Sequence, residues 1–417
     1  MITNIRKTYN EFPKSFWTLM LGVFIDRLGG ALIFPFFALF ITARFNVGMT
    51  EVGYLFAVLT ITGLFGSFLG GAMTDKFGRK TMMLYGLIIS GLSSLSLIFI
   101  DNLPQLYLVG AFIGLLGNLG GPASQAMIAD LLPEEKRTEG FGIFRVTFNL
   151  SVTFGPLIGG FLAEQSYNWL FIIDAVSSVI TGLIVWLAIP ETKPQKEVGE
   201  PEETFAESVG GYRKVFKDVA FMIFIGVGAL STAVYLQMNT SLSVYMRDIA
   251  SLPVKYFGYI LSMNAAMVVF MQFWFTRRIS NRPPMLMMTL GTALYAIGFG
   301  IFGFGLSVWV FVLGMIILTI GEMIVSPVWS TLVAKFAPED MRGRYMAIGG
   351  FSWAVPNMIA PLLAGLILDN SEPHWLWYAC LIVGSIAASG YYMLHRQASS
   401  RLSLEEQVEM QLAESQA

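Results

Sequence analysis

The sequence predicts an all-α integral membrane protein, with twelve transmembrane helices in two six-helix bundles related by an internal repeat. Three observations support this fold class. The 417 residues are 55% hydrophobic and only 13% charged, and a mean hydropathy of +0.64 does not suit a surface that faces water. Apolar runs long enough to span a bilayer, about 20 residues each, recur twelve times. The second half of the chain also repeats residues of the first half at a constant spacing.

The apolar runs divide six and six on either side of a polar segment that contains Glu191, Pro194 and Pro201. This composition is typical of a solvated linker. The expected domains are an N-terminal bundle at 1–189, a cytoplasmic linker at 190–216, a C-terminal bundle at 217–395 and a cytoplasmic tail at 396–417. The twelve predicted spans are residues 15–42, 50–74, 81–100, 104–131, 138–164, 168–189, 217–247, 254–276, 283–302, 306–334, 341–368 and 374–395.

The positions of lysine and arginine predict that both chain ends are cytoplasmic. With both termini inside, the outer segments carry only Arg44, Arg247 and Lys255, and almost all other basic residues fall in inner segments. Short loops orient by their cations, and the first apolar run is too long for a cleaved signal peptide. We therefore expect a multi-pass protein of the cytoplasmic (inner) membrane.

The internal repeat follows an ungapped offset of 205 residues. It aligns Arg137 with Arg342 and Gly160 with Gly365, across a helix, a loop and the next helix. Shared hydrophobicity does not explain matches at Pro, Glu and Arg. Parallel repeats of this kind place a substrate site between the bundles near the bilayer midplane, and alternating access follows as the mechanism. The other matches are Pro122 with Pro327, Ala129 with Ala334, Pro133 with Pro338, Glu134 with Glu339, Pro156 with Pro361 and Leu157 with Leu362.

A short charged turn, GAMTDKFGRK, joins the predicted second and third helices. Two helices must reverse direction across it, and Gly78 is free to take the positive φ that other residues resist. The turn resembles the loop between helices 2 and 3 of the major facilitator superfamily, G-x-x-x-D-(R/K)-x-G-R-(R/K). Every fixed position of that pattern is matched. The matching residues are Gly71, Asp75, Lys76, Gly78, Arg79 and Lys80.

Together with twelve spans and six-plus-six repeats, this resemblance covers the whole chain and implies a secondary active transporter. In that family the charges of the turn are thought to latch the cytoplasmic side when the transporter faces outward. Carried over, Asp75 would pair with Arg342 or Arg344 in the other half. The alternative is that these charges only orient the loop and cap helices.

Residues 151–160 are similar to the helix 5 signature G-x-x-x-G-P-x-x-G-G of drug and proton antiporters in this superfamily, with Ser151 in place of the first glycine. Closely spaced glycines let a helix approach a neighbour, and proline bends it. A gate and a packing seam both fit this pattern, and the resemblance favours efflux over uptake. The remaining signature residues are Gly155, Pro156, Gly159 and Gly160.

The antiporter group usually carries an arginine in helix 4, but the aligned position here is Gly110. Arg145 in predicted helix 5 or Arg27 in helix 1 could supply the missing charge. An ionisable group at the bilayer centre costs about 2.5 to 3.5 kcal/mol, so each needs a paired, wet or functional setting. Adjacent helical residues diverge by about 100°, so we expect one of Asp26 and Arg27 to face the cavity and the other a neighbouring helix.

Glu322 in predicted helix 10 and Asp26 are the candidates for a proton that substrate displaces, with Arg27 and Arg145 tuning them. Glu322 aligns with Gly117 and so breaks the repeat. A structural salt bridge, for example between Asp26 and Arg145, is the alternative. Asp174 is expected near the outer interface, where water solvates it. The residues expected to line the cavity are Asn149, Tyr235, Gln237, Asn239, Asn264, Trp329, Trp353 and Asn357.

The function expected from these features is proton-coupled export of a small amphipathic or lipophilic compound. Uptake of a sugar or metabolite is the alternative, followed by a transporter-like sensor. An enzyme is not expected, because no nucleophile with a base partner is visible and His374 and His395 lie in an outer loop and the tail. The sequence also has no G-x-x-x-x-G-K-(S/T) phosphate loop, which speaks against an ATP-driven pump. With Cys380 alone, neither an intrachain disulfide nor a zinc site is expected. We expect no metal, cofactor or nucleic acid, and a monomer whose partners are substrate, protons and lipid.

Overall fold

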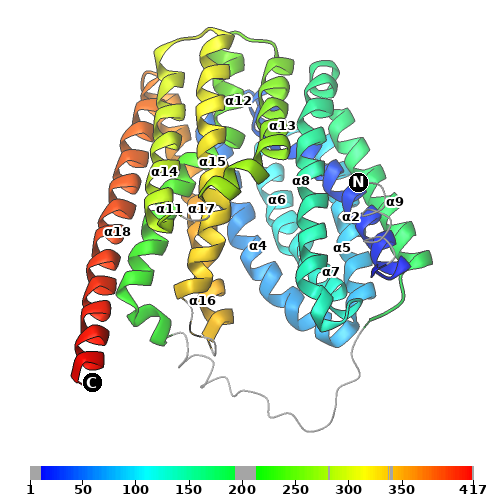
Figure 1. Cartoon of the computed structure of the whole chain (residues 1–417). Helices are drawn as coiled ribbons and strands as arrows, with labels where there is room; N and C mark the ends of the chain where they lie inside the picture. The colour runs from blue at the N-terminus through cyan, green and yellow to red at the C-terminus, as the bar shows by residue number, and fades with distance from the viewer. Residues whose placement is uncertain (1–10, 193–212, 280–281, 337, 339–340, 416–417) are drawn as a thin grey trace. The chain divides into compact units, whose positions relative to one another are not determined.

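The computed structural model describes residues 11–192, 213–279, 282–336, 338 and 341–415, and every regular element in these ranges is a helix (Figure 1). Within these residues, twelve helices are long and apolar enough to cross a membrane. The prediction of an all-α protein with twelve spans is therefore confirmed. Side chains at several described positions are not defined, among them those of Asp75 and Arg342.

The elements of the first half of the chain follow one another through short connections. They are α2 (Lys14–Ile33), η1 (Phe34–Phe36), α3 (Phe37–Phe45), α4 (Met49–Phe77), α5 (Arg79–Ile98), α6 (Leu103–Gly117), η2 (Asn118–Gly120), α7 (Gly121–Asp130), α8 (Glu134–Gln165) and α9 (Asn168–Ala188).

The second half starts with helical residues at 213–217, and the elements from α11 onward follow. They are α11 (Val219–Thr240), α12 (Leu242–Val244), the π-helix η3 (Tyr245–Ile249), α13 (Val254–Ile279), α14 (Pro284–Ile301), η4 (Phe302–Phe304), α15 (Val308–Phe336), α16 (Arg342–Gly349), α17 (Phe351–Asn370) and α18 (Trp375–Ser415).

Two spans that the sequence predicts as continuous are interrupted at proline and glycine residues. Pro35 falls in η1, which separates α2 from α3 within one span, Lys14–Phe45. The fourth span breaks at η2, between Gly117 and Gly121, and Pro122 stands in the first turn of α7. Glycine lowers helix stability and proline removes a backbone donor, so short 3₁₀ turns occur there. The repeat partner Pro327 instead lies inside the continuous helix α15.

The chain divides into two compact units. The first unit contains the described residues within Met1–Glu200, together with Gln237–Val269 and Pro361–Ser371. In it, α2 packs against α8 and α9, α5 against α9, and α4 against α6. One of its apolar clusters surrounds Phe16, Met83 and Met127. Parts of α11, α13 and α17 thus belong with the helices of the first half.

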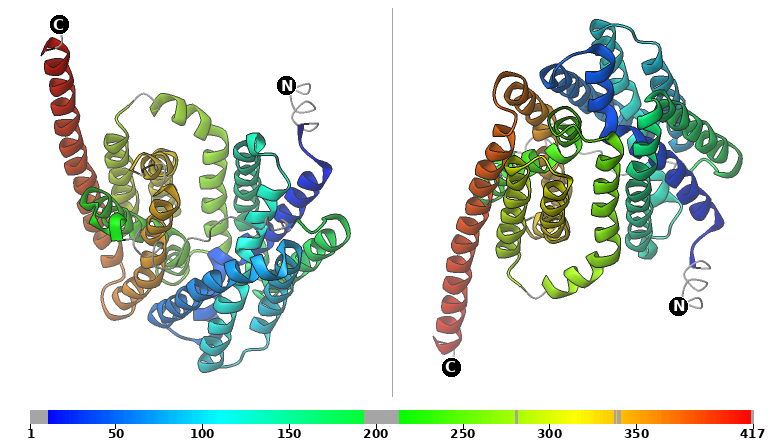
Figure 2. Two further views of the ribbon diagram at one scale, coloured as in Figure 1. Left: turned by 90° about the horizontal axis from the view of Figure 1, so that it is seen from below. Right: turned by 90° about the horizontal axis from the view of Figure 1, so that it is seen from above.

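The second unit contains the described residues within Pro201–Leu236, with Phe270–Ala360 and Glu372–Ala417. Helix α14 packs against both α15 and α18, and the three lie side by side in Figure 1. Gly291 and Gly321 allow the close approach of α14 and α15, because a Cβ on Gly321 would lie 2.6 Å from the Gly291 carbonyl oxygen. The core gathers around Phe221, Phe224 and Tyr391. Figure 2 shows α18 continuing as one helix to the end of the described chain.

Gly78 alone separates α4 from α5, and its φ is +96°. This value lies in the region that glycine adopts without strain. The predicted tight reversal at Gly78 is confirmed.

Candidate functional site

The second unit contains a cavity of about 250 Å³, which we call the Glu322 cavity. Residues of α11, α14, α15, α17 and α18 contribute to it, and aromatic side chains form much of its wall. The lining residues are Gly228, Ser231, Thr232, Tyr235, Tyr295, Glu322, Val325, Ser326, Trp329, Ser330, Trp353 and Tyr391.

Glu322 is the acidic group of this cavity, and aromatic rings lie around it. The Tyr235 hydroxyl donates a 2.9 Å hydrogen bond to Glu322 Oε1. The Tyr235 ring in turn lies 5.4 Å from the Tyr295 ring and 6.0 Å, edge to face, from Trp353. Aromatic faces attract cations, so this arrangement suits a ligand that combines a positive charge with apolar surface.

Trp329 is held in place on the wall of the Glu322 cavity. Its indole stacks on Phe224, with ring centroids 4.5 Å apart. Gly228 leaves room for it, because a Cβ there would collide with the indole ring. The wall at Trp329 is therefore preformed by packing.

The first unit contains a smaller cavity of about 180 Å³, which we call the Asp26 cavity. Asp26 and Arg27 both line it, so the expectation that only one of them would face a cavity is wrong. A cavity wall spans a wide arc of a helix and can take two adjacent residues. The remaining lining residues are Val23, Met83, Gly86, Leu87, Ser90, Gly117, Asn118, Gly120, Gly121 and Ser124.

The two cavities occupy equivalent places in the two repeats. The offset of 205 residues pairs Asp26 with Ser231 and Gly117 with Glu322, so the acidic group has moved from the first helix of one repeat to the fourth helix of the other. The other equivalent lining residues are Val23 with Gly228, Arg27 with Thr232, Ser90 with Tyr295, Gly120 with Val325, Gly121 with Ser326 and Ser124 with Trp329.

Asp174 is buried, with 4% of the residue exposed, so its expected solvation at the outer interface is wrong. Ser94 Oγ on α5 donates a hydrogen bond to Asp174 Oδ2. The position of Asp174 along the predicted helix does not indicate which way its side chain faces around that helix. It faces the other helices of its unit.

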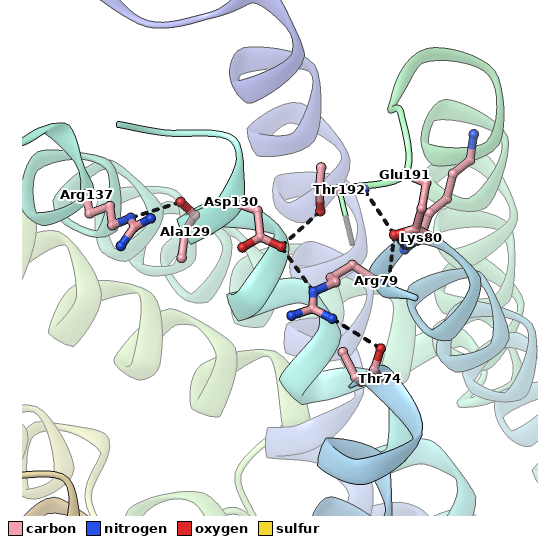
Figure 3. A network of polar contacts seen from close by, with 8 residues as sticks. All are labelled: Thr74, Arg79, Lys80, Ala129, Asp130, Arg137, Glu191 and Thr192. Carbon is pink, nitrogen blue, oxygen red and sulfur yellow. Dashed lines mark hydrogen bonds and ion pairs between the residues drawn. The ribbon is translucent and has the colours of Figure 1, made fainter. Parts of the chain in front are cut away.

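The Gly78 turn is held by contacts within the first unit (Figure 3). Arg79 Nε lies 3.0 Å from Asp130 Oδ2 at the end of α7, in a largely buried ion pair. Arg79 Nη1 also donates to the Thr74 carbonyl oxygen at 3.4 Å. The Glu191 carboxylate accepts 2.8 Å and 3.2 Å hydrogen bonds from the backbone N–H groups of Arg79 and Lys80, at the start of α5. Negative charge at a helix N-terminus is favourable.

Sequence reasoning missed Asp130 and Glu191. Glu191 was assigned to a solvated linker, yet it caps α5 beside the turn. The available signal was charge complementarity, because both acidic residues end predicted helices on the same side as the basic turn. The predicted partner pairing of Asp75 with Arg342 involves side chains outside those that the structure describes.

The helix 5 motif forms a packing seam within the first unit. A Cβ on Gly155 would lie 2.8 Å from the Ala31 carbonyl carbon on α2, and one on Gly159 would lie 2.9 Å from the Leu32 oxygen. Gly160 meets α13, where the Cα of Gly258 would lie 3.2 Å from such a Cβ. Small residues let these backbones approach closely.

The repeat partner of Gly160 makes a matching contact. A Cβ on Gly365, in α17, would collide with the Met49 backbone at the start of α4. Asp369, one turn later, accepts hydrogen bonds from Met49 N at 2.9 Å and Thr50 N at 2.7 Å. An acidic side chain of α17 therefore caps α4 at the end opposite the Gly78 turn.

Arg247 fixes η3 at that same end. Its guanidinium donates to the Leu39 carbonyl oxygen at 3.1 Å and to Thr42 Oγ1 at 2.8 Å, and it pairs with Asp248. Burial opposes the charge, but the hydrogen bond and charge of Asp248 raise the pKa of Arg247 overall. Burial also raises the pKa of the neighbouring Tyr167. These contacts persist in neutral solution.

Several predicted lining residues lie away from both cavities. Gln237 is buried, and its Oε1 accepts a 2.6 Å hydrogen bond from Ser241. Asn357 donates to the Trp353 carbonyl oxygen at 2.9 Å. Asn149 and Arg145 have exposed side chains on α8. Of the predicted residues, the structure brings Glu322, Tyr235, Trp329 and Trp353 together in one cavity, and Asp26 and Arg27 in the other.

Twelve spanning helices, repeat-related cavities and the charged Gly78 turn define the class of multi-pass membrane transporters. The Major Facilitator Superfamily model matches residues 19–361 and 287–415, and the chain belongs to that superfamily. It is 27% identical to a Na⁺, Li⁺, K⁺/H⁺ antiporter of Planococcus maritimus over 92% of this chain and 96% of that one.

Another relative covers half of the chain. The class B tetracycline resistance protein of Escherichia coli is 32% identical over 48% of this chain and 51% of its own length. Among solved structures, the nucleoside transporter NupG matches 91% of this chain and 100% of its own, with a TM-score of 0.78 and 14% identity. The fold is thus that of superfamily transporters, and the chain is a secondary transporter.

Proposed function

We propose that the protein is a proton-coupled exporter of small amphipathic compounds that works by alternating access. The observation that carries this proposal is the Glu322 carboxylate in an aromatic cavity, with Tyr235 as its hydrogen-bond donor. A carboxylate in this setting can hold a proton or pair with a cationic ligand. Substrate and proton then compete for one group, which is the minimum that antiport requires.

The aromatic wall favours a lipophilic cation as substrate. Tyr235, Tyr295 and Trp353 offer π faces beside the carboxylate, and the cavity volume of about 250 Å³ suits a small organic molecule rather than a bare ion. The helix 5 motif and the relative described as a tetracycline resistance protein support export over uptake. Substrate, protons and lipid would be the partners of a monomer.

The Gly78 turn would act as part of the gate on the cytoplasmic side. The ion pair of Arg79 with Asp130 and the Glu191 cap hold the turn rigidly to its own unit, which suits a lever that moves with that unit. Gly71, Asp75, Lys76, Lys80 and Arg342 would complete the gate, and the helix 5 glycines would form its hinge seam. The concentration of basic residues on this side supports cytoplasmic termini in the cytoplasmic membrane.

The side-chain chemistry of the protein supports the two competing classes, an enzyme and a sensor, less well than a transporter. An enzyme would need a reactive group with a partner base, and the sequence places His374 and His395 in an outer loop and the tail. A sensor would need a signalling element besides the transport cavities. We therefore propose transport as the activity.

Flux in everted membrane vesicles tests this function directly. With tetraphenylphosphonium as probe and an acid interior, we expect wild-type vesicles to accumulate the cation and Glu322→Gln vesicles not to do so. Accumulation in right-side-out vesicles instead would establish uptake. Equal flux by the wild type and Glu322→Gln would overturn the assignment of Glu322.

Monovalent cation/proton antiport is the second candidate. It is favoured by the relative described as a Na⁺, Li⁺, K⁺/H⁺ antiporter, which aligns over 92% of this chain. In everted vesicles with an acid interior, NaCl or KCl would then dissipate the pH gradient, and Asp26→Asn would abolish the effect. A gradient insensitive to both salts excludes this candidate.

A further inference from the structure

One buried ionisable side chain in the first unit takes no part in the proposed exchange at Glu322. The Asp174 carboxylate on α9 accepts a hydrogen bond from Ser94 on α5, and only 4% of the residue is exposed. An acidic group inside a spanning helix costs about 2.5 to 3.5 kcal/mol. Holding two helices together does not require that cost, because a well-packed apolar pair serves as well.

The second repeat shows that the fold itself does not need this polar pair. The offset of 205 residues places Phe299 at the position of Ser94 and Ala379 at the position of Asp174. Phe299 is fully buried and stacks on Trp377, with ring centroids 6.2 Å apart. The same interface is apolar there, so Asp174 and Ser94 are specific to the first unit.

Asp174 lies beside Asp26 along the contact between α2 and α9. Thr181 Oγ1 donates a 3.0 Å hydrogen bond to the Gly22 carbonyl oxygen at one end of this contact. At the other end, a Cβ on Gly29 would lie 2.7 Å from Asp174 Oδ1. Asp26 stands between Gly22 and Gly29 on α2, and its charge and that of Asp174 act on each other. Two carboxylates therefore share one buried interface.

The two carboxylates of Asp26 and Asp174 carry one more negative charge than the neighbouring Arg27 balances. On α2, Arg27 follows Asp26 and its positive charge acts on that carboxylate. On α5, the residue that faces Asp174 is the neutral Ser94, since Arg79 and Lys80 belong to the first turn. On α8, the charged residues within the spanning part are Glu139, Arg145 and Glu164, all of them exposed, and the two glutamates pair with Lys136 and Lys255. Like charges in low dielectric favour protonation of one partner.

We propose that Asp174 and Asp26 share a bound proton and form a second proton site, separate from Glu322. This inference rests on the proposed proton coupling. The carboxylate pair takes a proton from water on the acidic side and returns it to water on the other side, and only an O–H bond forms and breaks. The exporter would then move more than one proton for each cation, which drives export of a cation against the membrane potential.

Infrared difference spectroscopy of the purified protein tests the site without a substrate. Between mildly acidic and mildly alkaline buffer, we expect the wild type to show a protonated-carboxyl band that Asp174→Asn removes. Ser94→Ala keeps the carboxyl group but removes its donor, so it should shift this band. Thr181→Val is the matched control, because it removes a hydrogen bond from the same helix contact and should leave the band unchanged.

The spectrum separates this inference from the proposed function. An unchanged carboxyl band in Asp174→Asn, with a normal fold shown by the thermal transition, would overturn the second proton site while the Glu322 assignment stands. Loss of the band in Glu322→Gln alone would also overturn the second proton site. If the wild type fails to transport tetraphenylphosphonium, that result contradicts the proposed export. It does not affect the carboxyl band of Asp174, which tests the second proton site separately.

Discussion

The Glu322 cavity and the Asp26 cavity occupy the same place in the two repeats but differ in chemistry. The first is larger and aromatic, with Tyr235, Tyr295 and Trp353 around one carboxylate. The second is smaller and is lined by Asp26 and Arg27 with glycine and serine. Where the second unit has Glu322, the first has Gly117.

We infer from this difference that the two repeats divide the work of transport. Bulky aromatic rings give contact area to an organic substrate, whereas the glycine and serine residues of the Asp26 cavity give it little. In this proposal the second unit binds the substrate and exchanges it for a proton at Glu322, and the first unit binds a further proton. Substitutions in either cavity test this division.

The largest effect is expected from removing the acidic group of each cavity in turn. Glu322→Gln should weaken tetraphenylphosphonium binding at least about tenfold, because it removes an attraction between opposite charges that is worth about 1 to 4 kcal/mol at a separation of about 4 Å. Asp26→Asn should leave the dissociation constant within about twofold of the wild-type value, and change only the pH dependence of flux. Isothermal titration calorimetry measures the dissociation constants of the two variants.

Glu322→Asp is the control for the first variant, since it keeps the charge. An Asp26→Asn protein that loses substrate affinity as strongly as Glu322→Gln would break the proposed division.

The next effect concerns the aromatic wall. Trp353→Ala should weaken binding of the probe about threefold to tenfold, because one cation–π contact is worth about 0.5 to 2 kcal/mol. Trp353 is 46% exposed, so the variant should fold. Trp353→Phe retains a ring face and should recover most of the affinity. Equal affinities of the wild type, Trp353→Ala and Trp353→Phe for the probe would show that the aromatic wall does not contribute to binding.

Glycine substitutions probe the Asp26 cavity by size. A Cβ on Gly86 would lie 2.9 Å from the Cα of Gly120, so Gly86→Ala should destabilise the protein by about 1 to 3 kcal/mol through overpacking. Gly121 lines the same cavity but has no heavy atom within 4 Å of such a Cβ. Gly121→Ala is therefore the matched control and should not lower stability. Thermal unfolding in detergent measures both, and equal transitions would contradict the close packing.

The smallest effect is expected at the donor of the Glu322 carboxylate. Tyr235→Phe removes a hydroxyl that donates a 2.9 Å hydrogen bond and keeps the ring. In the proton-loaded state both partners are neutral, and such a hydrogen bond contributes about 0.5 to 1.5 kcal/mol, so proton-driven flux should change about threefold. A flux as low as that of Glu322→Gln would contradict this small effect and would make the Tyr235 hydroxyl as essential as the Glu322 carboxylate.

Much of the fold could be predicted from the sequence, because hydropathy and basic residues report directly on spans. The Gly78 turn and the helix 5 glycines were also found, since a positive φ and a close backbone approach each demand glycine. Glu322 and Asp26 stood out because a charge in an apolar run is costly and rare.

The remaining site residues could not be read from one sequence. Tyr235 and Gln237 are two residues apart and so point in nearly opposite directions on a helix, yet both were expected in the cavity. Tyr295 lines it but has no feature that separates it from an ordinary apolar helix residue. The burial of Asp174 depends on which neighbouring helix it faces. Only tertiary packing fixes that direction.

The central claim is that substrate displaces a proton from Glu322, and proton release on ligand binding tests it most directly. Titration of the purified protein with tetraphenylphosphonium in buffers of different ionisation enthalpy gives the number of protons released per ligand bound. We predict release by the wild type and by Asp26→Asn, and none by Glu322→Gln. Release from Glu322→Gln equal to that of the wild type would contradict the account.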